Sequence, residues 1–104
     1  MTPTGRTKER YNPIPTAREK AYHLWLMVMF PCAACCGTAT CVHHPLKRHP
    51  DQRWRRDHEY VVALCDGCHR AIHAAGSEAK AFPGIDFAYE AALCRGGAIT
   101  LGKL

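Results

Sequence analysis

The feature that most constrains this chain is a pair of CxxC motifs, Cys32-x-x-Cys35 and Cys65-x-x-Cys68. Each motif brings two sulfurs close enough to bind one ion, and zinc prefers four such ligands in a tetrahedron at about 2.3 Å. We therefore predict a structural Zn²⁺ site formed by both motifs, with the first motif making a tight turn around the ion. Cys36 directly follows Cys35, so the spacing alone leaves open which of these two residues is the ligand.

Size and composition agree with a metal-stabilised fold. With 104 residues the chain has room for one modest domain, and a core this small is often held together by a metal or by disulfides. Residues 1–20 contain no apolar run typical of a signal peptide, and no stretch approaches the roughly 20 apolar residues that span a membrane. We therefore expect a cytoplasmic protein with no membrane partner, in which paired cysteines bind metal rather than form disulfides.

The order of polar, apolar and turn-forming residues predicts a small α+β fold. Thr16 and Glu19 form a capping-box pattern, which starts a helix that ends near Phe30, before Pro31. The apolar residues at helical spacing in this segment are expected to face the core: Ala21, Leu24, Trp25, Val28 and Met29. Residues 38–43 and 59–64 favour short strands.

Two further helices are expected after the second strand. Asp66 can cap a helix that Gly76 closes, and Asp86 can cap a last helix that runs through Leu93. Glycines after this point indicate a loose end. The expected organisation is a flexible basic arm over residues 1–15, a single domain over 16–95 and a loose tail over 96–104.

Four histidines form a pattern typical of a metal site. His43 and His44 are adjacent at the expected end of the first strand, whereas His69 and His73 are i and i+4 on a helix and share one face. Three imidazoles can hold a divalent ion and leave positions open for substrate, unlike a closed structural site. The fourth is then available as a general base. The alternatives are a second structural zinc site, or a His69 that serves only to pack the cysteine knuckle.

These residues resemble the motifs of the HNH endonucleases, which are also called the ββα-metal or His-Me finger group. The resemblance covers about residues 31–76 and rests on His43-His44, on Val62-Ala63-Leu64-Cys65-x-x-Cys68-His69 and on His73. The CxxC pairs are similar to those of the zinc-bound subgroup, and residues 76–86 are similar to the tail of short phage and prophage HNH proteins, some of them linked to DNA recombination. The resemblance implies a ββα-metal core with a four-cysteine zinc knuckle, flanked by an N-terminal and a C-terminal helix.

The resemblance also implies a role for each histidine. His44 would be the general base that activates water, while His43, His69 and His73 would hold a catalytic divalent ion such as Mg²⁺ or Mn²⁺. In this family the ion neutralises the scissile phosphate and the departing 3′ oxygen, and the products carry 5′ phosphates.

One position departs from the family pattern. The family's asparagine, which steadies the loop that carries the base, corresponds to Tyr60, which has no amide. His58, Glu59 or Asp57 can orient His44 in its place. Tyr60 therefore puts catalysis in question more than the fold.

A basic loop and a formal net charge of +5 favour a polyanionic partner. The candidate DNA-binding residues of this loop are Lys47, Arg48, Arg53, Trp54, Arg55 and Arg56. Arginine suits bidentate phosphate contact, and Trp54 can stack on a base or insert at a distorted step. The alternative is a solvated loop whose tryptophan packs on the domain. No segment resembles a base-reading helix, so we expect recognition of DNA structure rather than sequence.

The leading hypothesis is a metal-dependent DNA endonuclease that hydrolyses phosphodiester bonds in phage or bacterial DNA processing, in the cytoplasm of a bacterial host cell. The alternative is a weakly active or inactive zinc-stabilised DNA-binding module. A third hypothesis is an interaction protein that uses the zinc fold as a scaffold for recombination proteins. The sequence leaves the oligomeric state open.

Overall fold

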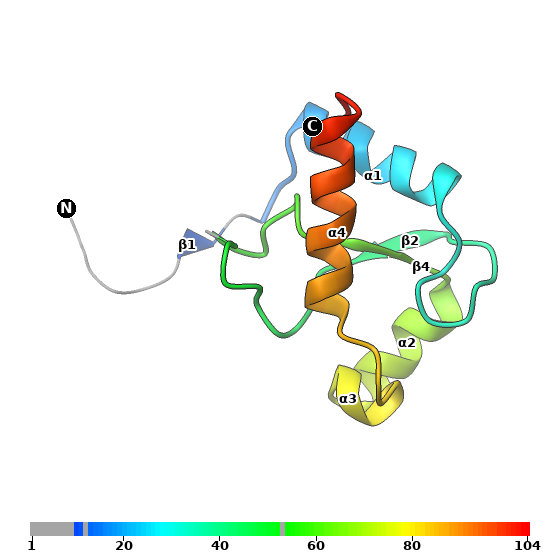
Figure 1. Cartoon of the computed structure of the whole chain (residues 1–104). Helices are drawn as coiled ribbons and strands as arrows, with labels where there is room; N and C mark the ends of the chain where they lie inside the picture. Colours follow the sequence, from blue (N-terminus) through cyan, green and yellow to red (C-terminus); the bar gives the residue numbers. More distant parts are fainter. Residues whose placement is uncertain (1–9, 12, 53) are drawn as a thin grey trace.

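The computed structural model describes residues 10–11, 13–52 and 54–104, which form a small, compact α+β structure (Figure 1). The elements along the chain are β1 (Arg10–Tyr11), α1 (Ala17–Met29), β2 (Cys41–His43), β3 (Trp54–Arg55), β4 (Val62–Leu64), α2 (Asp66–Ala75), α3 (Glu78–Ala81) and α4 (Phe87–Thr100). The predicted arm over residues 1–15 lies outside the described residues at 1–9 and 12. Within the described part of the chain, no helix has the length and apolar character needed to cross a membrane.

The strands form two short pairs, one antiparallel and one parallel. β2 and β4 are antiparallel, with Cys41 opposite Leu64 and His43 opposite Val62. β1 and β3 pair in parallel, so the end of the predicted basic arm lies along the predicted basic loop. Figure 1 shows α4 crossing the β2–β4 pair, with α1 near its C-terminal half and with α2 and α3 at the other end.

The start of α1 confirms the predicted capping box. The Thr16 hydroxyl accepts from the Glu19 backbone N–H over 3.1 Å, and the Glu19 carboxylate accepts from the Thr16 N–H over 2.8 Å. Of the predicted core face, Trp25 packs against the second core cluster as expected, but the rest of the prediction is wrong. The buried residues of α1 are Tyr22, His23 and Leu26, and exposed apolar side chains lie on the predicted face: Leu24, Val28 and Met29.

The face of α1 that carries Tyr22 and Leu26 packs on β4, and the segment around β4 is apolar on both sides. Residues 61–64 are all buried, and they alternate between two clusters of core residues. The first cluster contains Cys32, Tyr60, Val62, Leu64, Ile72, Phe87 and Ala91. The second contains Tyr22, Leu26, Ala39, Val61, Ala63 and Ala98. β4 is therefore the central element of the fold.

α2 begins inside the second CxxC motif and ends shortly after His73. Its N-cap is Cys65, whose sulfur accepts from the Cys68 N–H, so the predicted cap Asp66 is instead the first helical residue. Gly76 ends the helix with φ 84°, as the sequence predicts, because a left-handed C-cap favours glycine.

The C-terminal helix is longer than predicted. Asp86 caps α4 as expected, with its carboxylate accepting from the Tyr89 N–H over 3.0 Å, but the helix continues past Leu93 to Thr100. Residues 96–100, which were predicted to belong to a loose tail, are therefore helical. Ala98 has no exposed surface and packs in the second cluster, and this burial compensates for the low helix propensity of the two preceding glycines.

Candidate metal centres

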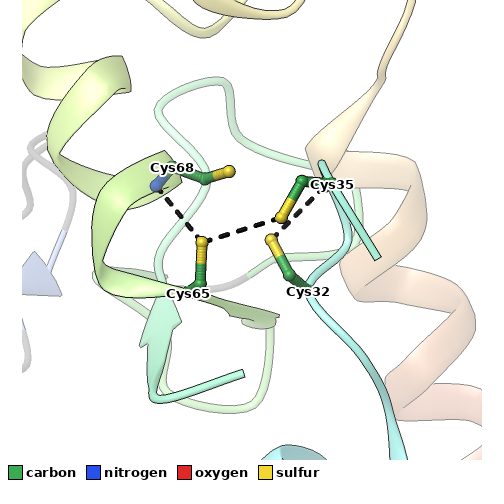
Figure 2. A group of neighbouring side chains, drawn as sticks. All are labelled: Cys32, Cys35, Cys65 and Cys68. Atoms are coloured by element: carbon green, nitrogen blue, oxygen red, sulfur yellow. Dashed lines mark hydrogen bonds between the residues drawn. The ribbon is translucent and has the colours of Figure 1, made fainter. Parts of the chain in front are cut away.

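The two CxxC motifs come together in space. The sulfurs of Cys32, Cys35, Cys65 and Cys68 all lie within 4.8 Å of one another, and Figure 2 shows the thiols of the first motif facing those of the second. The Cys35 and Cys65 sulfurs are 3.8 Å apart, which equals the sulfur–sulfur edge of about 3.8 Å in a tetrahedron with metal–sulfur bonds of about 2.3 Å. This group of four cysteines can hold a structural metal ion such as zinc.

Backbone N–H groups near the cysteine sulfurs favour the thiolate form that binds a cation. The N–H groups of Cys35 and Cys68 point at the sulfurs of Cys32 and Cys65, at 3.5 and 3.4 Å. Burial opposes ionisation of Cys32, but backbone N–H groups directed at its sulfur outweigh burial and lower its pKa to about 6. Burial and the neighbouring thiols raise the pKa of Cys68. Four thiols this close lose their protons together only when a cation offsets the charge, so the donor set fits Zn²⁺.

The structure also shows which of the two neighbouring cysteines, Cys35 or Cys36, lies in the cysteine group. Cys35 belongs to the group and Cys36 does not; Cys36 instead occupies the turn with φ 64°. A Cβ at Gly37 would lie 3.3 Å from the Cys35 sulfur, so the turn is tight where it approaches the site. Cys94 packs against the second core cluster, as expected for a core thiol.

Three of the four singled-out histidines form a second group. Ligand nitrogens of His43, His69 and His73 lie within 4.8 Å of one another. His69 and His73 approach to 3.1 Å between their Nε2 atoms, within the roughly 3.0–3.4 Å expected for two nitrogens that bind one ion at about 2.1 Å. Burial, and then His43 and His73, lower the pKa of His69, which favours the neutral imidazole that metal binding requires.

His44 follows His43 in the chain, and its ring contacts a different pair of histidines, His23 and His58. Its Nε2 is 2.8 Å from Nδ1 of His58, and the Nε2–H of His23 donates to the His58 carbonyl over 2.7 Å. Burial first, then the neighbouring His58 and His23, lower the pKa of His44 from 6.5 to about 3, so its imidazole is neutral at pH 7. His58, one of the three residues considered for orienting His44, contacts its ring.

Tyr60 is part of the core. Its side chain is 4% exposed and belongs to the first cluster. Its ring stacks on His49 at 5.7 Å, and the Arg95 guanidinium lies 5.0 Å from the ring centre. Arg95 in turn donates to Glu59 over 2.7 Å, so these residues tie the loop to α4. The contacts of Tyr60 are those of a packing residue.

The candidate DNA-binding loop is described in part. Lys47, Arg48 and Arg56 are exposed, and Arg56 has φ 61°. Arg53 lies outside the described residues, and the backbone of Trp54 and Arg55 forms β3. Lys47 and Leu46 line one side of an open groove of about 680 Å³, and residues 76–79 and 84–87 line the other.

The sequence analysis missed the residue that bonds to His43. The carboxylate of Glu78 accepts from the Nε2–H of His43 over 2.6 Å. A lone glutamate near a glycine carries no spacing signal, and only the contact in space identifies it. The sequence matches no protein-family model, and it matches no curated protein.

Proposed function

We propose that this protein is a metal-dependent DNA endonuclease with a ββα-metal core, in which the histidine group is the catalytic centre. The observation that carries the proposal is the convergence of three histidines from two elements, β2 and α2, with a neutral fourth histidine next to His43 in the chain. The HNH-like motifs of the sequence support the same interpretation.

The histidine group differs from the cysteine group in the way a catalytic site differs from a structural one. Four thiolates fill a tetrahedral zinc site, whereas three imidazoles leave coordination positions for water and substrate. A divalent ion such as Mg²⁺ or Mn²⁺ bound there would stabilise negative charge on the scissile phosphate and on the departing 3′ oxygen. His73 is exposed, so substrate can reach this group from solvent.

His44 is the proposed general base, and its hydrogen bond determines which atom can act. When the Nε2–H of His44 donates to Nδ1 of His58, Nδ1 of His44 carries the lone pair that takes a proton from water. The donated hydrogen bond holds the imidazole in this tautomer. His58 then supplies the orienting contact that the family's asparagine supplies elsewhere, so Tyr60 is free to serve in the core.

Exposed basic side chains lie on the segment between β2 and β4. The side chains of Lys47, Arg48 and Arg56 are suited to phosphate contact. Contacts with phosphates do not depend directly on the base sequence. We therefore expect duplex binding that weakens steeply with salt, because phosphate contacts release counterions.

A DNA-binding module without turnover is the second candidate function. The low pKa of His44 favours it, because general bases work best with a pKa near the working pH. Recombination proteins as partners remain a further proposal from the resemblance alone.

A plasmid-nicking assay with Mg²⁺ or Mn²⁺, run beside a gel-shift assay at two salt concentrations, separates the two functions. Under the endonuclease proposal the wild-type protein nicks the plasmid and His44→Ala abolishes nicking while duplex binding persists. Glu90→Ala is the control, because Glu90 is exposed on α4 and lies outside the histidine group, and it should still nick. Binding without nicking by the wild type would favour the module, and equal nicking by His44→Ala would remove His44 from the mechanism.

A further inference from the structure

Glu78 is a buried carboxylate whose closest partner is the buried member of the histidine group. The side chain of Glu78 is 10% exposed and that of His43 is 1% exposed. Their 2.6 Å contact is short even for a charge-assisted hydrogen bond. Oε2 of Glu78 also accepts from the backbone N–H of Leu46 over 2.8 Å. Two donors therefore fix this oxygen in place.

The turn and the helix cap before Glu78 determine where its side chain lies. Gly76 ends α2 with a left-handed turn, and Ser77 caps α3 by accepting from the Lys80 N–H over 3.1 Å. Glu78 is the first residue of α3, so its position follows directly from the turn and the cap. Leu46, which holds the same carboxylate oxygen, lies shortly after β2.

The imidazole of His43 is confined on its other sides. Its ring contacts those of His69, at 5.3 Å between centroids, and Phe87, at 5.7 Å, both nearly edge-on. In the neutral form of this ring, donation of the Nε2–H to a carboxylate leaves the lone pair on Nδ1. Nδ1 is then the atom that His43 offers alongside the nitrogens of His69 and His73.

We propose that Glu78 is a positioning residue for the histidine metal site, which fixes the ring and the tautomer of His43 so that Nδ1 is the ligand atom. The inference rests on the proposed metal site. Metal-bound histidines commonly donate their second N–H to a carboxylate, and loss of that partner typically costs 10–100-fold in metal affinity. The other interpretation is a buried ion pair that only ties α3 to β2, and it predicts no effect on metal binding beyond stability.

The test measures Co²⁺ binding to the full-length protein after its cysteine site has been loaded with zinc. Visible absorption of Co²⁺ at the histidine site reports affinity for the wild type, Glu78→Ala, Glu78→Gln and the control Glu90→Ala. Glu90 is an exposed glutamate on α4 outside both ligand groups. We expect Glu78→Ala to bind about 10–100-fold more weakly. Glu78→Gln should recover most of the affinity, because its amide oxygen can still accept from His43, and Glu90→Ala should match the wild type.

Affinity of Glu78→Ala within twofold of the wild type would overturn the proposal. If Glu78→Ala does not fold, ¹⁵N NMR of the His43 ring in the wild-type protein still decides, since an Nε2–H tautomer is required and an Nδ1–H tautomer would overturn the inference. The two proposals fail separately. Wild-type protein that binds Co²⁺ at the histidines but never cuts DNA would count against the endonuclease and leave the role of Glu78 intact.

Discussion

Two variants, Cys35→Ser and Cys36→Ser, test the assignment of the zinc ligands. They replace neighbouring thiols, of which only the first belongs to the cysteine group. The Cys35 sulfur lies 3.8 Å from that of Cys65, within the group of four, whereas Cys36 lies outside the group. Both residues are exposed, so neither substitution opens a cavity in the core. Any difference between the variants therefore reports on metal binding.

The expected effect is large because the cysteine group is part of the core. Cys32 is 1% exposed and packs in the first cluster, and the Ala33 N–H donates to the Ala63 carbonyl over 2.9 Å. Structural zinc contributes an apparent free energy of roughly 10–16 kcal/mol in small domains, as much as the roughly 5–15 kcal/mol by which whole domains are stable. Removal of zinc should therefore unfold the chain, and Cys35→Ser should weaken zinc binding by more than the roughly 100-fold cost of losing an outer-shell partner.

The assay combines zinc content by elemental analysis with unfolding followed by circular dichroism during titration with a chelator. Wild type and Cys36→Ser should carry about one zinc per chain and unfold together at high chelator concentration. Cys35→Ser should release zinc and unfold at a much lower concentration. Zinc loss by Cys36→Ser with retention by Cys35→Ser would refute the assigned ligand set. A zinc-free wild-type chain that still melts cooperatively would refute the expected magnitude.

Two further predictions concern the packing of α1 and the buried histidine it carries. Leu26→Ala should destabilise the zinc-bound protein by about 2–5 kcal/mol, because Leu26 has no exposed surface, while Leu24→Ala should change stability by less than about 0.5 kcal/mol in the same urea titration. Burial lowers the pKa of His23 below 6.5, so the unfolded chain binds a proton there more tightly than the folded chain, and stability should fall as the pH drops below 6.5. In His23→Gln the amide can still donate to His58 but cannot titrate, so the fall in unfolding free energy with falling pH should be shallower by up to about 1.4 kcal/mol per pH unit. Equal slopes for the wild type and His23→Gln between pH 7 and about 5.5 would contradict the reasoning.

Features set by short-range chemistry were predictable from the sequence. The capping box of Thr16 and Glu19, the left-handed Gly76 and the Asp86 cap depend on residues close together in the chain, and the structure contains all three. The grouping of the cysteines was predictable for a related reason. Four sulfurs at two short spacings favour a single arrangement around an ion, whatever the intervening loop does.

Features set by packing between distant segments were not predictable. Helical spacing predicted one apolar face of α1, but the face that packs in the second cluster with Val61 and Ala63 carries Tyr22 and Leu26. Gly96 and Gly97 have low intrinsic helix propensity, yet the burial of Ala98 keeps α4 helical through them. Glu78 could not be assigned either, because it is 35 residues from His43 in the chain and the two side chains meet only in the folded structure.

The position of β4 between two apolar clusters limits how far the chain can be shortened. α4 contributes Phe87 and Ala91 to one cluster and Ala98 to the other, so it spans both sides of the strand pair. A fragment restricted to residues 31–76 would carry every cysteine and histidine of the two ligand groups, yet it would leave Val61 and Ala63 without their cover of Leu26 and Ala98. An engineer who wished to transplant the two ligand groups into another scaffold would have to bring both outer helices, or replace the apolar surface that each supplies.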